Sequence, residues 1–371
     1  MYITSIHLEN FRNYTEGDVV FTDKTNILYG DNAQGKTNIL EAAYLSATTG
    51  SHRMSRDKDM IRFDCEEAHI TLNVMKRDVE HRIDMHLRKN KNKMVYVDRL
   101  PIKRTTELFG LINIIFFSPE DLSIVKEGPK ERRRFMDMEL CQLSRIYLNN
   151  LSDYNKVLVQ RNNLLRSILY DHKGSAGQLV DTLDIWDEQL VQFGKRVISE
   201  RKNFIDMLRD VVVKVHEKIT GGRETIDIRY EPSVDPEEFA DSLVKRRDQD
   251  LKYTATSVGP HRDDIGIYID QNDVRTFGSQ GQQRTAALTL KLAEIELVKS
   301  MISDTPILLL DDVMSELDEK RRGALIESLD GIQSIITCTG YSDFIRERMS
   351  PENAKNNRIF HVSKGTVEEV V

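Results

Sequence analysis

A glycine-rich stretch at residues 30–37 has the residue types and spacing of a phosphate-binding loop. It reads GDNAQGKT and fits the pattern G-x-x-x-x-G-K-[ST]. Glycine permits backbone angles at which successive N–H groups close around phosphate oxygens. Lys36 can reach the outer phosphates of a bound ligand, and the Thr37 hydroxyl can ligate Mg²⁺. The candidate phosphate contacts are Gly30, Asp31, Asn32, Ala33, Gln34, Gly35, Lys36 and Thr37.

Two acids far downstream complete this chemistry. Residues 305–312 form an apolar run that ends in Asp311 and Asp312, which is typical of a strand. Carboxylates at the carboxyl end of such a strand face the crevice where ligands bind. We expect Asp311 to join the Mg²⁺ shell. Asp312 points elsewhere because strand side chains alternate, and it could orient or deprotonate a water. The alternative, that both acids only keep the strand end soluble, is weakened by the loop upstream.

A polar turn lies between these two motifs. Ser279, Gln280 and Gly281 precede a helix expected over residues 286–300. The serine hydroxyl and nearby backbone N–H groups could bind an anion at the helix N-terminus. The same residues are equally typical of an ordinary N-cap.

Several strands and helices must position these residues. Residues 26–29 and 38–45 predict the strand and helix that flank the glycine loop. Strands are also predicted at residues 2–11 and 18–21, and in a meander at 69–76, 82–87 and 93–98. The apolar run at residues 111–117 predicts a central strand.

The character of the chain changes after Gly128 and Pro129. Apolar residues recur at helical spacing up to about residue 215, with a break at residues 171–177. This pattern predicts an amphipathic helical hairpin, each half reaching on the order of 60 Å if unbroken. It could protrude as an arm or pack back as a helical lobe. After Gly221 and Gly222, a strand is predicted at residues 225–230, where the chain returns to the sheet-bearing body. A short helix is predicted next, with Asp235 as its N-cap and Pro236 at its first position.

Composition limits the classes of function. The 371 residues carry a formal net charge of −7, so any nucleic-acid site must be a local basic face. The three cysteines are far apart, which disfavours a disulfide framework or zinc site. No signal peptide or membrane-spanning run is evident, so we expect a cytoplasmic protein without membrane contact.

Local basic clusters are the candidates for a nucleic-acid face. They comprise His52, Arg53 and Arg56 after the first helix, and Arg88, Lys89, Lys91 and Lys93 at the tip of the meander. A third cluster, Arg132, Arg133 and Arg134, could instead form ion pairs within the arm. Each cluster can equally be ordinary solvated surface.

The order of motifs resembles the ABC-type P-loop ATPase heads, an α/β fold with a mixed sheet, here interrupted by a helical arm. The long insertion between Lys36 and Ser279 resembles the DNA-repair and chromosome branch, which includes the SMC proteins. Within it the chain is similar to the RecF family of bacterial recombination mediators. The resemblance is carried in order by residues 9–14, 34–38, 117–122, 132–135, 259–264, 279–284, 310–312 and 315–318.

This resemblance implies roles at matching positions. ATP and Mg²⁺ are the expected cofactors, and Asn38 joins the loop residues in binding ATP. Arg12, Asn13 and Tyr14 would lie near the adenine. Ser279, with Gln280 and Gly281, would contact the ATP held by a second subunit, and Asp318 would lie at the dimer seam. No role follows for residues 259–264.

Three departures from the ABC pattern affect the expected chemistry. Residues 118–121 stand where a glutamine often follows the central strand. Only Thr337 or Thr339 is available where a switch histidine is usual. Asp312 occupies the position of the usual glutamate, so slow turnover is expected.

The resulting hypothesis is an ATP-gated, DNA-binding homodimer of recombinational repair and replication, with weak DNA-stimulated ATPase activity and other recombination mediators as partners. The predicted segments are a first half-head at 1–127, a helical arm at 128–222 and a second half-head at 223–371. A transporter ATPase subunit would not need the arm, and a chromosome-organising head would need a longer one.

Overall fold

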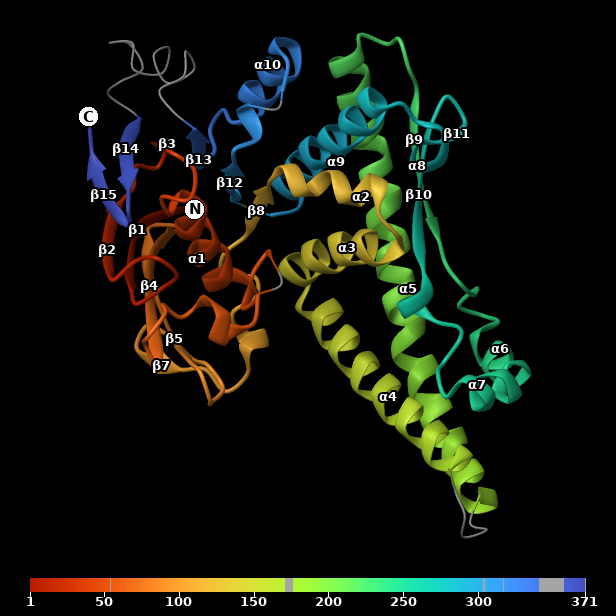
Figure 1. Cartoon of the computed structure of the whole chain (residues 1–371). Helices are drawn as coiled ribbons and strands as arrows, with labels where there is room; N and C mark the ends of the chain where they lie inside the picture. Colours follow the sequence, from red (N-terminus) through yellow and green to blue (C-terminus); the bar gives the residue numbers. More distant parts are fainter. Residues whose placement is uncertain (54, 171–175, 303, 316, 340–356, 371) are drawn as a thin grey trace. The chain divides into compact units, whose positions relative to one another are not determined.

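The computed structural model describes residues 1–53, 55–170, 176–302, 304–315, 317–339 and 357–370. The chain forms two compact units, one comprising Met1–Asp121 and Glu294–Val371 and the other Leu122–Ala293 (Figure 1). The three-segment division at 1–127, 128–222 and 223–371 stays a prediction about domain organisation. Within the described residues, no helix combines the length and apolarity needed to span a membrane.

An antiparallel sheet forms one layer of the first unit. Its strand order is β2-β1-β4-β5-β6-β7. Side chains alternate across it, so Ile6, Leu8 and Ile70 are buried on one face while the other face is polar. The predicted strand pair and meander are confirmed. The bounds are β1 (Tyr2–Glu9), β2 (Glu16–Val20), β4 (Glu67–Lys76), β5 (Val79–Arg88), β6 (Met94–Val97) and β7 (Leu100–Pro101).

The second sheet of this unit is mixed, with order β15-β14-β3-β13-β12-β8. Its strands run parallel except β15, which is antiparallel to β14. This arrangement confirms the predicted α/β class with a mixed sheet. The bounds are β3 (Thr25–Gly30), β8 (Ile114–Phe117), β12 (Ile307–Asp311), β13 (Ser334–Thr339), β14 (Arg358–Ser363) and β15 (Thr366–Glu369).

The prediction that residues 111–117 form a central strand was wrong. Only Ile114–Phe117 forms β8, and β8 ends the strand order. All four of its residues are buried. An apolar run reports burial on both faces, and helix packing can bury an edge strand as fully as a central one.

Helix α1 (Lys36–Thr48) packs against both sheets of the first unit. This position explains why nearly all of its residues are buried, including Glu41. The unit also holds α10 (Glu319–Ser328) and short 3₁₀ helices at Asp57–Met60, Thr105–Glu107 and Val313–Ser315, while Pro119–Leu122 forms a fourth at the boundary of the units.

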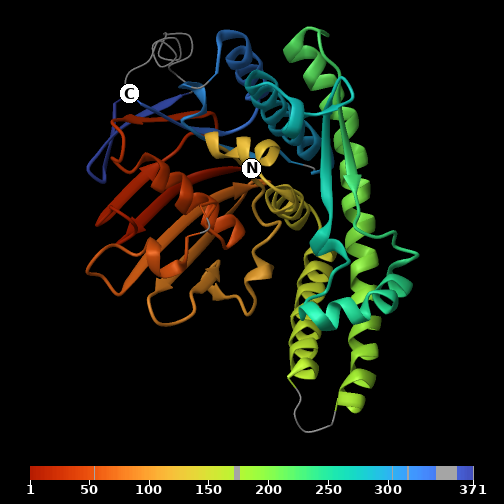
Figure 2. The ribbon, with the colours of Figure 1, turned by 45° about the vertical axis from the view of Figure 1, so that its right-hand side comes forward.

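The second unit is built on long helices. Helices α4 and α5 lie side by side in Figures 1 and 2, with a three-stranded sheet of order β11-β10-β9 along α5. Helix α9 (Gln280–Met301) begins in this unit. The other bounds are α2 (Ser123–Lys126), α3 (Pro129–Leu143), α4 (Arg145–Leu169), α5 (Ala176–Thr220), β9 (Ile226–Glu231), α6 (Phe239–Lys245), α7 (Arg247–Tyr253), β10 (Asp264–Ile269), β11 (Asn272–Asp273) and α8 (Val274–Phe277).

The predicted hairpin is present but asymmetric. Its first half is interrupted at Ser144, whose hydroxyl caps α4 by accepting a hydrogen bond from the Tyr147 N–H. Its second half is the single 45-residue helix α5, about 68 Å long. Only the second half therefore has the predicted length of about 60 Å. Residues 171–175 of the predicted turn lie outside the described residues.

Two predictions after the hairpin were wrong in detail. Strand β9 does not return to the sheets of the first unit, because it pairs with β10 in the second. Alternation identifies a strand but not its partner. Asp235 does not cap a helix, since α6 begins only at Phe239. The Asp235 carboxylate instead accepts a hydrogen bond from the Glu237 N–H in the preceding turn.

Residues 259–264, which had no predicted role, tie the helices and strands of the second unit together. The Gly259 φ of +121° suits glycine, and a Cβ there would come within 2.5 Å of the Tyr154 hydroxyl on α4. Arg201 of α5 donates to the Pro260 carbonyl at 2.6 Å. Arg132 of α3 donates two hydrogen bonds to Asp264, and the buried Asp263 carboxylate accepts from Tyr230, Ser233 and Arg201.

His261 in this segment is held as a neutral ring. Its Nε2 lies 2.9 Å from the Thr256 carbonyl, which can only accept, so Nδ1 accepts from the Tyr154 hydroxyl at 2.6 Å. Burial lowers the pKa of His261 from 6.5 to about 4. On acidification the unfolded chain therefore takes up this proton before the folded one does.

Acid is predicted to destabilise the second unit through His261. The contribution is complete above a pH of about 6.5 and is lost as the pH falls toward 4, by up to about 3 kcal/mol. The glutamine of His261→Gln does not titrate in this range, so the variant has no such loss. The difference in unfolding free energy between parent and variant, measured by urea titration, should therefore shrink as the pH falls from 7.5 to 4. A difference that stays constant over this range would contradict the prediction.

Candidate functional site

The glycine loop connects the end of β3 to the start of α1 and needs glycine at both ends. Gly30 and Gly35 have φ values of +152° and +117°. A Cβ at Gly30 would lie 2.3 Å from the Val362 carbonyl oxygen, and one at Gly35 would lie 2.8 Å from the Tyr14 hydroxyl. The strand–loop–helix order predicted for residues 26–45 is thus confirmed, with the loop backbone in a conformation that few side chains tolerate.

Lys36 is buried at the mouth of this loop. Its ammonium group donates to the Gly30 carbonyl at 2.6 Å and the Asp31 carbonyl at 2.7 Å. Burial lowers the pKa of Lys36, while the neighbouring carboxylates of Asp312 and Asp311 act in the opposite direction. The Lys36 ammonium group is therefore held near the Asp311 and Asp312 carboxylates, where strand β12 ends.

Asp311 joins three elements of the first unit through one carboxylate oxygen. Its Oδ1 accepts from the Thr37 hydroxyl at 2.7 Å and from the Thr337 hydroxyl at 2.7 Å. Asp311 and Thr337 are register partners on the parallel strands β12 and β13. Thr37, Asp311 and Thr337 offer only oxygen donors, which is the ligand type that Mg²⁺ prefers.

Of the two threonines expected at the switch position, Thr337 is the one that contacts Asp311. It is buried, whereas Thr339 is exposed at the end of β13. Its hydroxyl also accepts from the Asp312 N–H at 3.0 Å. Asp312 lies beyond the end of β12 with a φ of +51°, so this left-handed backbone, and not strand alternation, directs its side chain. Its carboxylate accepts from Ser315 at 3.2 Å.

The turn at residues 12–14 braces the loop from outside. Asn13 donates to the Gln34 carbonyl at 2.8 Å and accepts from the Asn38 amide at 2.8 Å. The buried Tyr14 hydroxyl donates to the Gly35 carbonyl at 3.1 Å, and burial raises the pKa of Tyr14. Asn13 and Tyr14 thus fix the loop backbone, while their contact with adenine stays a prediction.

Sequence reasoning missed a second brace, formed by Lys364 and Gly365 in the turn between β14 and β15. The Lys364 N–H donates to the Gln34 side-chain oxygen at 2.7 Å, and the Gly365 N–H donates to the Gln34 carbonyl at 3.1 Å. Gly365 has a φ of +78°, and a Cβ there would lie 2.6 Å from the Asn13 carbonyl oxygen. A Lys-Gly turn between two strands was the available signal.

Arg12 is committed to helix α1. Its guanidinium donates to both carboxylate oxygens of Glu41, at 2.8 and 2.7 Å, and to the Ser55 hydroxyl at 2.7 Å. Burial works to raise the pKa of Glu41, but hydrogen bonds from Arg12 and Ser51 hold it below its usual range. Arg12 therefore fixes the segment that follows α1, while its contact with adenine stays a prediction.

Ser279 belongs to the second unit, where it forms a capping box at the start of α9. Its N–H donates to the Gln282 side-chain oxygen at 3.0 Å, and its hydroxyl accepts from the Gln282 N–H at 3.2 Å. A contact of Ser279, Gln280 or Gly281 with nucleotide stays a prediction. In the segment 315–318, Glu316 lies outside the described residues, while Asp318 caps α10 by accepting from the Arg321 N–H at 2.9 Å.

The structure separates the basic candidates by exposure. Arg53, Arg56 and Lys91 are exposed. Lys93 is more enclosed, because its ammonium group donates to Asp57 and to the Thr49 carbonyl. Lys89 lies 3.2 Å from Glu66. In the second unit, Arg132 is buried against Asp264 and Arg133 donates to the Asp263 carbonyl, so these two have structural roles.

Comparisons with known proteins agree with these motifs. The family model described as RecF/RecN/SMC N terminal domain matches residues 2–368. The chain is 56% identical over 370 residues to the DNA replication and repair protein RecF of Agathobacter rectalis, covering 100% of this chain and 99% of that relative. It is 55% identical over 369 residues to the protein of that name from Lachnoclostridium phytofermentans, with complete coverage of both.

Solved structures give the same result. A structure described as the recombination mediator protein RecF-ATP in the RecFOR pathway matches with a TM-score of 0.91 and 36% identity, covering 100% of this chain and 98% of that one. An Smc head bound to the C-winged helix domain of ScpA matches at 16% identity with a TM-score of 0.56, which shows a shared fold. The full-length matches at high identity show that the chain belongs to the RecF family.

Proposed function

We propose that this chain is an ATP-gated DNA-binding protein of recombinational repair and replication. ATP joins two heads on DNA that contains gaps or single-strand–duplex junctions, and slow hydrolysis separates them. The names of the relatives, a DNA replication and repair protein and an ATP-bound recombination mediator, support this proposal. It places the protein in the cytoplasm, with other recombination mediators as partners.

The single observation that carries the proposal is the cluster of Lys36, Thr37 and Asp311 at the glycine loop. The lysine supplies a positive charge, and the loop backbone is fixed by hydrogen bonds on two sides. Thr37 and Asp311 would hold Mg²⁺, which offsets phosphate charge when it is bound. Thr37 and Asp311 fit this ion, because their hydroxyl and carboxylate oxygens already lie 2.7 Å apart. The positive φ values of Gly30 and Gly35 fit a loop that closes around phosphate groups.

In this proposal Asp312 takes a proton from water. Its backbone N–H is held by Thr337 and its carboxylate by Ser315, so the side chain is oriented before any ligand binds. An aspartate reaches less far than the glutamate usual in ABC-type heads. This shorter reach is the physical reason to expect slow turnover and a long-lived ATP-bound dimer.

Asp312→Asn is predicted to bind ATP normally and to hydrolyse it at least about 100-fold more slowly, because the amide keeps the shape and removes the base. Sizing chromatography with ATP should show more dimer than for the parent. Asp330→Asn, an exposed acid of the same unit, is the matched control and should behave like the parent. A monomer for both Asp312→Asn and the parent in ATP would exclude gating by dimerisation.

The proposed dimer has two composite sites, each with Lys36 from one chain and Ser279 from the other. The capping box at Ser279 leaves its hydroxyl exposed at a helix N-terminus, a location that favours anions. A closed two-fold dimer repeats the same contact twice. A substitution of Lys36 in one chain and one of Ser279 in the other then affect the same composite site, and the second site stays intact.

Mixing Lys36→Met with Ser279→Arg is predicted to restore ATPase activity that neither variant has alone. Each mixed dimer keeps one intact site, so recovery should reach up to about half the parental rate per mixed dimer if the sites act independently. Ser279→Thr keeps the hydroxyl and should be near parental. No recovery, together with no ATP-dependent crosslink between cysteines placed beside Lys36 and Ser279, would refute the composite site.

DNA binding is predicted to depend on the exposed residues of the basic candidates. Changing Arg53 and Lys91 together to Glu should weaken binding to gapped DNA and lower the slope of log K against log salt by about 1 to 2, since each phosphate contact contributes about 0.9. Changing Arg77 and Arg99 together to Glu makes the same charge change at exposed positions at the other end of β5 and β6 and is the control. Fluorescence anisotropy at several salt concentrations measures both, and an unchanged slope would exclude this face.

A further inference from the structure

A second group of metal-ligand side chains lies on the β1–β2 hairpin, on the polar face of the antiparallel sheet. His7 of β1 is the register partner of Asp18 of β2, and Glu9 is the register partner of Glu16. Because strand side chains alternate, these four project from one face, opposite the buried Ile6 and Leu8. The hairpin thus places one imidazole among three carboxylates.

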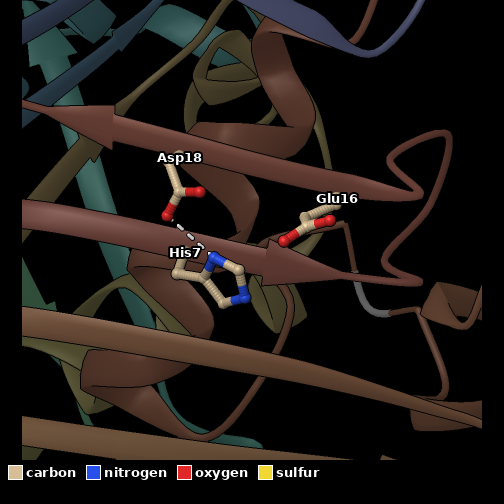
Figure 3. Close-up of side chains that lie close together, drawn as sticks. All are labelled: His7, Glu16 and Asp18. Carbon is tan, nitrogen blue, oxygen red and sulfur yellow. Dashed lines mark hydrogen bonds and ion pairs between the residues drawn. The ribbon is translucent and has the colours of Figure 1, made fainter.

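The side chains of three of these residues converge. His7 Nδ1 lies 2.8 Å from Asp18 Oδ1. The possible ligand atoms of His7, Glu16 and Asp18 all lie within 4.8 Å of one another. Figure 3 shows both carboxylates directed toward the imidazole ring from the neighbouring strand. Small side-chain rotations would bring these atoms to the spacing that a single ion requires.

The charge pattern of the hairpin independently favours a cation. Glu9 and Glu16 are directly opposite on adjacent antiparallel strands, and both are exposed. Like charges in this relation destabilise a strand pair. Asp18 adds a third carboxylate on the same face, 2.8 Å from His7 Nδ1. A divalent ion would offset this repulsion.

We propose that the β1–β2 hairpin binds a divalent transition-metal ion of the zinc class through His7, Glu16 and Asp18. One imidazole nitrogen and two carboxylate oxygens are ligands that Zn²⁺ accepts, with water completing the shell. Mg²⁺ prefers oxygen ligands alone, so the histidine selects against the ion proposed for the glycine loop. The site is formed by residues of the first unit that the glycine loop does not use.

Such an ion would cross-link the two strands on either side of the turn at residues 12–14. That turn donates hydrogen bonds to the carbonyls of Gln34 and Gly35 in the glycine loop. A bound metal would therefore stiffen the hairpin that braces this loop. The expected direct effect is higher thermal stability of the full chain with Zn²⁺.

The test is a Zn²⁺ titration of the nucleotide-free full chain by calorimetry, with chelator-treated buffer and no Mg²⁺. The parent should bind one equivalent of Zn²⁺ at this site, and neither His7→Gln nor Glu16→Gln should bind it. The chain offers a matched control in the His81–Asp98 pair, which has the same imidazole–carboxylate contact at 2.9 Å but forms no three-residue cluster among the described residues. His81→Gln should keep the equivalent.

Co²⁺ provides a second readout, because its visible absorption reports protein ligands. The spectrum should be lost in His7→Gln and kept in His81→Gln. Full Zn²⁺ binding by His7→Gln would overturn the proposal. So would loss of the bound Zn²⁺ in Asp311→Asn, because the ion would then lie at the glycine loop. Loss in His7→Gln with full binding by Glu16→Gln would also overturn it, since three ligands are proposed. The positions are exposed or half-buried, and circular dichroism would verify that each variant folds.

Discussion

The parallel register of β3, β13 and β12 is the constraint on which the candidate site depends. It sets Thr337 beside Asp311 and Thr339 beside Gly30. A slip of one residue would turn the Asp311 carboxylate to the other face of the sheet and break its bonds to Thr37 and Thr337. The buried strands leave little freedom for such a slip, because a slip would also move core side chains such as Leu309 and Ile336.

The glycine loop is held in shape by its surroundings as well as by its glycines. Turns from two distant parts of the sequence, at residues 12–14 and 364–365, donate to the backbone or side chain of Gln34. Each hydrogen bond contributes on the order of 1 kcal/mol. Together they reduce the conformational entropy that the loop would lose on binding a ligand, so affinity there depends on residues that need not touch the ligand.

The glycine loop and the Asp311 strand could be predicted because their spacing and flanking hydrophobicity are local signals. The bracing role of Lys364 and Gly365 could not, because it depends on β14 pairing with β3, more than 300 residues away in sequence. The same limit applies to β9, whose partner strand no local pattern specifies. Strand alternation predicts one direction for the Asp312 side chain, but β12 ends one residue earlier and a left-handed backbone at Asp312 sets its direction instead.

The capping box at α9 occupies one of the two acceptor lone pairs of the Ser279 hydroxyl, through the Gln282 N–H. The hydroxyl can still donate its hydrogen and accept one further hydrogen bond, so its own chemistry does not select the sign of a ligand. That selection falls to the helix, because the positive end of the α9 dipole lies at this turn. Charge thus favours oxyanions over ammonium groups here before shape or size has any influence.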